Sequence, residues 1–355
     1  TSNGSNPIPP HIWVEHFTKI YVKGPVGDID WDAIEQDKSD WEVVKENLQR
    51  REIVYGTDGP SGPHQDDIIS EDEMIQAIRR INPSSVAGSD GLNGKIIKNV
   101  LLNAKVSAAL LHLFRLAYHT GQTPCAWTTA IMVALKKPGK DRLDPDNYRG
   151  ISLLNCIGKV YGSIIESKLR RSAGLPESQV GGVPNCGTPD ACLAQRTLCE
   201  KFAWLWSRLN SETPKRRGAP TNQEKLEKLW KNKAETLVSH SSLYDNGTGS
   251  EGEGLLITCF IDLRKAFPSV VRSIVQRKLA RNPEVHTLLL KAVNGLCEQF
   301  SFHMLTDDGF SDCVETEFGL PEGSVISPLL WAISKLDADE GLMEIDSSNG
   351  DPSPS

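Results

Sequence analysis

The sequence feature that most restricts the fold is a seven-residue run, Leu255–Ile261, which is apolar except for Thr258 and ends directly at Asp262. A largely apolar run of this length indicates a strand buried in a sheet. Elsewhere, apolar residues at helical spacing alternate with short β-prone runs, without the regular strand–helix repetition of a parallel α/β protein. The sequence therefore predicts an α+β fold.

Helices and strands follow from local patterns along the chain. Ser70 and Glu73 form a capping-box signature at the start of one helix, and Pro268 suits the first position of another. Asp307 and Asp308 precede a glycine, which is typical of a hairpin turn. Helices are expected at 70–81, 95–119, 156–171, 189–209, 268–279, 285–297 and from 327; strands are expected at 131–135, 300–305 and 313–317.

Composition divides the chain into five parts. The expected parts are an acidic, loosely structured lead-in with one or two short helices (1–67), an ordered region (68–209), a flexible polar insertion (210–254), a second ordered region (255–336) and a disordered acidic tail (337–355). The insertion and the tail are rich in Gly, Ser and charged residues, which do not bury enough apolar surface to fold.

Charge is distributed unequally among these parts. The whole chain carries 39 basic and 46 acidic residues, for a net charge of −7, which argues against a phosphate-rich partner. Residues 74–335, however, contain 33 basic and 24 acidic residues. The acidic residues near the two ends therefore make the net charge of the whole chain negative, although its middle segment is basic and compatible with nucleic-acid binding.

The location of the protein follows from features that the sequence lacks. It contains no run of about 18 apolar residues, so no membrane span is expected. It begins with neither Met nor a secretory signal, which suggests a fragment of a protein that is not secreted. Its eight cysteines include no C-x-x-C pair, which indicates reduced thiols in the cytoplasm or nucleus rather than a zinc site.

Asp262 is the candidate for metal chemistry that the residues themselves single out. A carboxylate at the end of a buried strand emerges at the edge of a sheet, where the strand fixes its position and a substrate reaches it. Mg²⁺ prefers such hard oxygen ligands. The alternative is an aspartate that only caps the turn after the strand.

Four segments in a fixed order add to this interpretation. They are KKPGKDRLDPDNYRGISLLNCIGKVY (136–161), QVGGVPNCGTPDA (179–191), FIDLRKAFPSV (260–270) and GLPEGSVISPLLW (319–331), preceded by NPSSVAGSDGLNGKIIKN (82–99). Together they resemble the fingers and palm motifs of reverse transcriptases encoded by non-LTR (LINE-like) retrotransposons. The resemblance covers about residues 68–336.

The resemblance implies a right-hand polymerase fold, with the fingers and the start of the palm in 68–209, a partial palm in 255–336 and no thumb. It also implies an RNA-directed DNA polymerase, a nucleotidyltransferase that extends a DNA primer on an RNA template with dNTPs. Mg²⁺ or Mn²⁺ is the implied cofactor, acting in two-metal nucleotidyl transfer. Protein partners are not implied.

The same resemblance assigns roles to residues of the third segment. Asp262 matches the first catalytic palm aspartate, which binds the metal ions, and the carbonyl of Leu263 adds a backbone ligand. The amides near Lys265 and Ala266 face the triphosphate. Phe267 matches the bulky residue that excludes a ribose 2′-hydroxyl, and a role as a core aromatic is compatible with this.

The other segments supply contacts to the nucleotide and the template. Lys136, Lys137 and Arg149 match finger cations that neutralise the incoming triphosphate, although the two lysines also suit a solvated loop. The template contacts fall on Gln179, Gly181, Ser327 and Pro328. Gly323 matches a position where the backbone approaches the base pair closely.

Two departures from the family pattern concern activity. The palm motif usually has Gln before its Gly, and this chain has Glu322, whose carboxylate repels a triphosphate. The family also needs a Tyr/Phe-x-Asp-Asp hairpin after residues 319–331, and the sequence contains none. Its two Asp-Asp pairs, at 66–67 and 307–308, both precede that segment.

These departures bear on whether the chain is an enzyme. The first expectation is a fragment of a retrotransposon reverse transcriptase that is inactive alone, because one carboxylate does not hold two metal ions at catalytic separation. The alternatives are a non-catalytic nucleic-acid-binding remnant, which the basic middle segment favours, and a pseudogene product.

Overall fold

A computed structural model describes residues 8–22, 68–175, 179–183, 186–211, 263, 265–298 and 300–336, together with six single positions between 35 and 46. The chain divides into two compact units. Unit 1 comprises Thr1–Pro176 and Leu263–Ser334, and unit 2 comprises Glu177–Asp262 and Lys335–Ser355. The predicted strand 255–261, the insertion 212–254 and the tail 337–355 lie outside the described residues.

Unit 1 is built around a four-stranded sheet with the strand order β2-β1-β3-β4. The strands are β1 (Thr129–Lys136), β2 (Tyr148–Leu153), β3 (Ser301–Thr306) and β4 (Gly309–Glu315). β1 pairs antiparallel with β2 and parallel with β3, and β3 pairs antiparallel with β4. Strands and helices are mixed, so the predicted α+β class is confirmed.

The predicted strands at 131–135 and 300–305 are confirmed, whereas the return strand predicted at 313–317 begins earlier, as β4 (Gly309–Glu315), directly after the turn. The run 131–135 lies in β1, and the β3–β4 hairpin turns at Asp307 and Asp308, which places the second Asp-Asp pair in a turn. The register of β3 and β4 shifts between His303 and Leu305. Local alternation and turn chemistry were sufficient to locate the hairpin.

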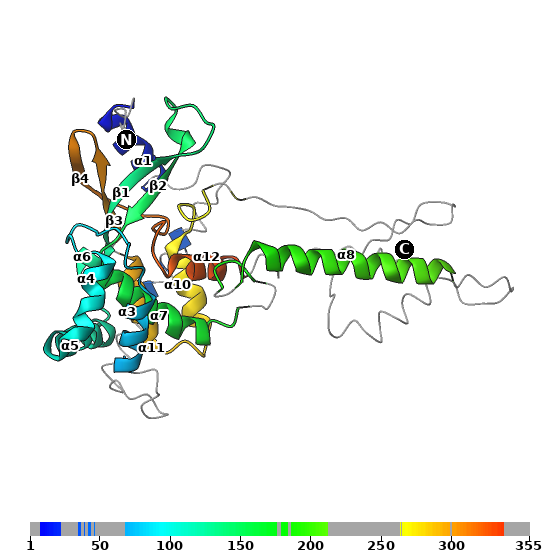
Figure 1. Ribbon diagram of the computed structural model, residues 1–355, viewed down its shortest axis with the longest axis horizontal. Coiled ribbons are helices and arrows are strands. Elements are labelled where there is room, and N and C mark those ends of the chain that lie inside the picture. The colour runs from blue at the N-terminus through cyan, green and yellow to red at the C-terminus, as the bar shows by residue number, and fades with distance from the viewer. Residues whose placement is uncertain are drawn as a thin grey trace. The chain divides into compact units, whose positions relative to one another are not determined.

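Helix α1 (Pro10–Tyr21) agrees with the expectation of a short helix in the lead-in, but its packing into the core was not predicted. Trp13, Phe17 and Tyr21 are each at most 3% exposed and form one face of the helix. The Trp13 ring lies 4.7 Å from that of Tyr148 in β2. As Figure 1 shows, α1 packs beside the strands, so this aromatic face is part of the core.

The other elements in the described part of unit 1 are helices (Figure 1). They are α3 (Glu71–Arg80), α4 (Gly94–Asn99), α5 (Ala104–Thr120), α6 (Cys125–Thr128), α7 (Cys156–Ser172), α10 (Arg272–Arg281), α11 (Thr287–Cys297) and α12 (Ser327–Ser334), with short 3-10 turns η1 (Val100–Leu102) and η2 (Pro145–Asn147). The expected helices at 70–81, 156–171, 285–297 and from 327 are confirmed, because the sequence carries their apolar spacing and caps.

The single helix expected at 95–119 is wrong, because it is broken into α4, η1 and α5. Asn103 causes the break: its backbone is extended, and its side-chain oxygen accepts hydrogen bonds from the amides of Lys105 and Val106. This is the geometry of an N-cap, which starts a new helix. The helical segments 94–102 and 104–120 are bent relative to each other by 112° at this break.

No single described helix is long and apolar enough to cross a membrane. The bent pair of residues 94–102 and 104–120 passes that test by length and composition alone.

Pro268 does not begin a helix, which corrects the prediction for that residue. Residues 265–269 form a turn, and α10 begins only at Arg272. The amide of Ser269 donates to the carbonyl of Lys265, and Pro268 is buried beneath Gly319. A long-range contact therefore holds the turn and delays the helix by four residues.

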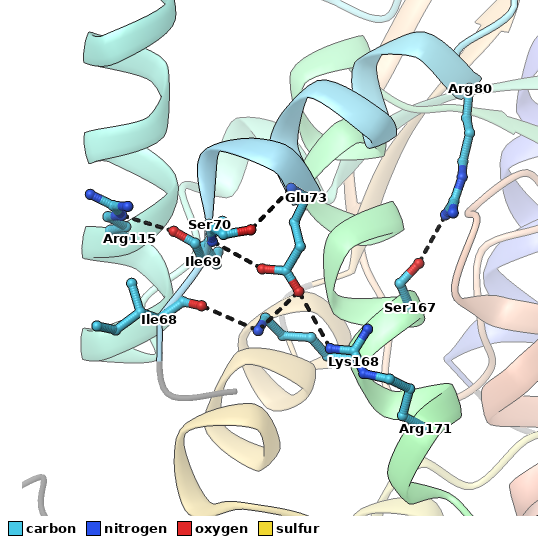
Figure 2. Close-up of polar contacts among 9 residues, drawn as sticks. All are labelled: Ile68, Ile69, Ser70, Glu73, Arg80, Arg115, Ser167, Lys168 and Arg171. Atoms are coloured by element: carbon cyan, nitrogen blue, oxygen red, sulfur yellow. Dashed lines mark hydrogen bonds and ion pairs between the residues drawn. The ribbon is translucent and has the colours of Figure 1, made fainter. Parts of the chain in front are cut away.

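A polar network joins the start of α3 to α5 and α7, and Figure 2 shows it. The capping box of Ser70 and Glu73 is present. The Glu73 carboxylate also pairs with Nζ of Lys168 at 3.2 Å and with Arg171 at 3.4 Å. Lys168 is 1% exposed and also donates to the carbonyl of Ile68. One carboxylate thus serves as a helix cap and as the partner of a buried cation.

In unit 2, the described part contains helix α8 (Thr188–Ser211), which confirms the helix predicted at 189–209. Asp190 accepts a hydrogen bond from the amide of Gly187 at 2.7 Å, which satisfies a backbone donor at the start of the helix.

Candidate functional site

Three of the motif segments, far apart in the sequence, meet in unit 1. The amide of Gly319 donates to the carbonyl of Val270 at 2.8 Å, and the amide of Leu320 donates to the carbonyl of Phe267 at 2.9 Å. Two residues further on, the carbonyl of Glu322 accepts from the amide of Ser152 in β2 at 2.7 Å. The loop 319–323 therefore bridges the turn 265–270 and strand β2.

Two glycines make this close approach possible. Gly319 has φ +79°, and a Cβ there would lie 2.8 Å from Cα of Pro268. Gly323 has φ +124°, and a Cβ there would lie 2.5 Å from the carbonyl oxygen of Ser152. Any other residue at these positions would meet backbone atoms and a strained backbone. The close approach at Gly323 is to β2, and the predicted approach to a base pair stays a prediction.

Arg272 holds the same loop from the first turn of α10, a role that was not predicted from the sequence. Its Nε donates to the carbonyl of Gly319 at 2.8 Å, and its Nη2 donates to that of Phe318 at 2.8 Å and to the hydroxyl of Thr316. Burial lowers the pKa of Arg272 to about 10. One buried guanidinium thus fixes the entry to the 319–323 loop.

The predicted finger cations lie at the end of β1 and on β2. Lys136 is exposed as the last residue of β1, and Arg149 is exposed on β2 opposite Leu135. The Nζ of Lys137 donates to the carbonyl of Asp146 in η2 at 2.8 Å. The structure thus places the three cations on one hairpin.

Lys265 joins this hairpin to the turn. Its Nζ lies 3.1 Å from Oδ1 of Asp146, so the turn and the β1–β2 connection are linked by an ion pair. The backbone of Lys265 has φ +50°, which is unfavourable for a residue with a Cβ. Next to it, the carbonyl of Ala266 accepts from the hydroxyl of Ser269, and Phe267 is half-buried.

Glu322 lies within the electrostatic reach of two of the cations. Its side chain is half-buried, and burial raises the pKa of its carboxyl, while the positive charges of Arg149 and Lys137 act in the opposite direction. The departure from the family pattern at this position therefore falls among the cations predicted to bind the triphosphate.

The remaining predicted residues are not all brought to this place. The hydroxyl of Ser327 is buried and donates to the carbonyl of Pro321, so it closes the turn before α12, and Pro328 follows in the helix. In unit 2, the Gln179 side chain donates to the carbonyl of Gly181 at 2.9 Å. Their predicted contacts with a template remain predictions.

The metal site also remains a prediction. Asp262 lies outside the described residues, and Leu263 beside it is exposed. Among the described residues, no group of three or more His, Cys, Asp or Glu side chains is arranged to hold a metal ion.

Comparison with known proteins bears on the family. The chain is 26% identical over 278 residues, 76% of its length, to the RNA-directed DNA polymerase from mobile element jockey of Drosophila funebris. It is 23% identical over 335 residues, 89% of its length, to the jockey protein of Drosophila melanogaster. The chain is a relative of non-LTR retrotransposon reverse transcriptases. The resemblance predicted from the motifs is thus confirmed.

A third relative is more similar over a shorter stretch. The putative 115 kDa protein in type-1 retrotransposable element R1DM of Drosophila melanogaster is 35% identical over 106 residues, 30% of this chain and 10% of that protein. The chain spans 24% and 30% of the lengths of the two jockey proteins. No protein family model matches it.

Proposed function

We propose that the chain is the fingers and part of the palm of a retrotransposon reverse transcriptase, an RNA-directed DNA polymerase. The observation that carries this proposal is the bridge of hydrogen bonds from Gly319, Leu320 and Glu322 to Val270, Phe267 and Ser152. It brings the fingers hairpin, the turn after Asp262 and the 319–323 loop together. A polymerase needs those three parts around one nucleotide.

In this proposal the chain is the part of the polymerase that binds a DNA primer on an RNA template together with the incoming dNTP. In the family reaction the primer 3′-hydroxyl attacks the α-phosphate of the dNTP, and pyrophosphate leaves. Lys136, Lys137 and Arg149 neutralise the triphosphate, and the half-buried Phe267 excludes a 2′-hydroxyl. Asp262 and the carbonyl of Leu263 would hold Mg²⁺ or Mn²⁺, and the bound ion would supply stabilisation of the charge that develops on the phosphate. The proposed location is the nucleus or cytoplasm.

We further propose that these 355 residues alone do not extend a primer. The printed sequence supplies Asp262 but no Tyr/Phe-x-Asp-Asp after residues 319–331. Two-metal transfer needs carboxylates on both ions. A non-catalytic nucleic-acid-binding role is the second candidate, and the basic composition of residues 74–335 favours it.

The test is binding of a dNTP to the chain on an RNA template with a chain-terminated DNA primer. We expect the templated dNTP to bind more tightly than the other three and than its ribonucleotide. Arg149→Ala is expected to weaken the templated dNTP about tenfold, because one charge contact to the triphosphate is lost. Lys95→Ala, on the exposed side of α4, is the matched control. With an unblocked primer, no extension is expected in Mg²⁺.

Duplex binding without any preference among nucleotides would support the non-catalytic role instead. Equal affinities of the Arg149→Ala and Lys95→Ala variants for the dNTP would contradict the proposed site. Primer extension that Asp262→Ala abolishes would contradict the proposed inactivity.

A further inference from the structure

The candidate site contains two carboxylates among its cations, Asp146 and Glu322. They come from different elements, since Asp146 lies in η2 between β1 and β2, whereas Glu322 lies in the loop before α12. The carboxylate of Asp146 pairs with Lys265 and its carbonyl accepts from Lys137, whereas Glu322 lies near Arg149 and Lys137.

The position of Asp146 is fixed by several contacts. The side chain of Asp144 accepts from its amide at 2.9 Å, which closes the η2 turn. Its carbonyl accepts from Nζ of Lys137 at 2.8 Å, and its carboxylate pairs with Lys265 at 3.1 Å. Asp146 therefore binds Lys137 through its carbonyl and Lys265 through its carboxylate.

The pair with Lys265 is a weak contact that a stronger anion can replace. Its side chains are 63% exposed for Asp146 and 47% exposed for Lys265. Exposed ion pairs contribute at most about 1 kcal/mol because water and salt screen them. A triphosphate carries several negative charges and therefore competes effectively for the same lysines.

The position of Glu322 is fixed by its backbone. Its carbonyl is bound to the amide of Ser152, and the next residue, Gly323, lies against the carbonyl of Ser152. The carboxylate is half-buried near Arg149 and Lys137, and the opposing effects of burial and of these charges on its pKa agree with that location. The contact with Ser152 holds the backbone of Glu322 beside β2, the strand that carries Arg149.

We propose that Asp146 and Glu322 compete with an anion for the cations of this site. A polyphosphate must displace the Asp146 carboxylate from Lys265, and it is repelled by the negative charge of Glu322. The identification of the anion as a dNTP rests on the proposed function, whereas the competition itself concerns any polyphosphate. The two carboxylates thereby lower the affinity of the site for a polyphosphate.

The test measures dissociation constants of the 355-residue chain for inorganic tripolyphosphate and, on a chain-terminated primer–template, for the templated dNTP, at pH 8 and low salt. Glu322→Gln removes one charge without changing the shape of the side chain, and Asp146→Asn frees Lys265 while its backbone contacts remain. Asp312→Asn, on exposed strand β4 at the far edge of the sheet, is the matched control.

We expect each of the two site variants to bind tripolyphosphate about tenfold more tightly than the unaltered chain, since removing a nearby like charge in a partly aqueous site is worth about one power of ten. Asp312→Asn should have no such effect. The gain should shrink in 0.5 M salt, because the charges are then screened.

The outcomes separate this inference from the proposed function. Tighter tripolyphosphate binding without preference for the templated dNTP would support the competition and contradict the polymerase role. Templated dNTP binding that neither Glu322→Gln nor Asp146→Asn strengthens would leave the polymerase role intact and overturn the competition. Absence of polyphosphate binding in every variant would overturn the competition as well, because the cations would then form no anion site.

Discussion

At the scale of single residues, buried charges in unit 1 are placed where they fix backbone geometry. Arg272 donates to the carbonyls of Gly319 and Phe318, and Lys168 donates to that of Ile68 and pairs with Glu73. Neither role was predictable from the sequence, because an isolated Arg or Lys on an amphipathic helix has the same local pattern when it is solvated. Their partners come from distant segments.

Lys168 offers a test at this scale. Lys168→Met should lower the free energy of unfolding by about 3 kcal/mol, because removing one partner of a buried ion pair leaves the other charge poorly compensated. Urea denaturation measures this change. Arg171→Met is the control: its side chain is 52% exposed on the same carboxylate, so the expected loss is under about 1 kcal/mol. Equal losses in the two variants would contradict a special role for the buried cation.

At the scale of elements, the sequence predicted those caps and turns that depend only on residues close to one another in the chain. The capping box at Ser70 and the Asp307–Asp308 turn each depend on residues within a few positions, and both are present. Trp13, Phe17 and Tyr21 have four-residue spacing, a signal that could have identified α1 as a core helix. By contrast, the turn at Pro268 depends on Gly319, about fifty residues away, so local helix rules did not apply.

The helix break at Asn103 leads to a prediction at this scale. Asn103→Ala removes the side-chain acceptor for the amides of Lys105 and Val106 and should lower the free energy of unfolding by about 1 kcal/mol. Chemical denaturation with far-UV circular dichroism measures it. Asn99→Ala is the matched control, since Asn99 precedes η1 without a capping side-chain hydrogen bond. If both substitutions had the same effect, Asn103 would not be the cap that starts α5.

At the scale of the whole molecule, the structure brings the β1–β2 hairpin, the turn 265–270 and the loop 319–323 together, and the family resemblance assigns these three segments to one predicted site. The parallel pairing of β1 with β3 joins residues more than 160 positions apart. No periodicity in either strand specifies such a partner, which is why the sheet order was not predicted. The part of the site that depends on Asp262 stays a prediction.

The most direct measurement is amide hydrogen exchange of the 355-residue chain on an RNA template with a chain-terminated DNA primer and Mg²⁺, with and without the templated dNTP. If the three segments surround one nucleotide, adding the dNTP should slow exchange in 137–149, 265–270 and 319–323 together, and leave strand β4 unchanged. Protection confined to one of these segments, or absent from all three while the nucleotide is bound, would contradict the account.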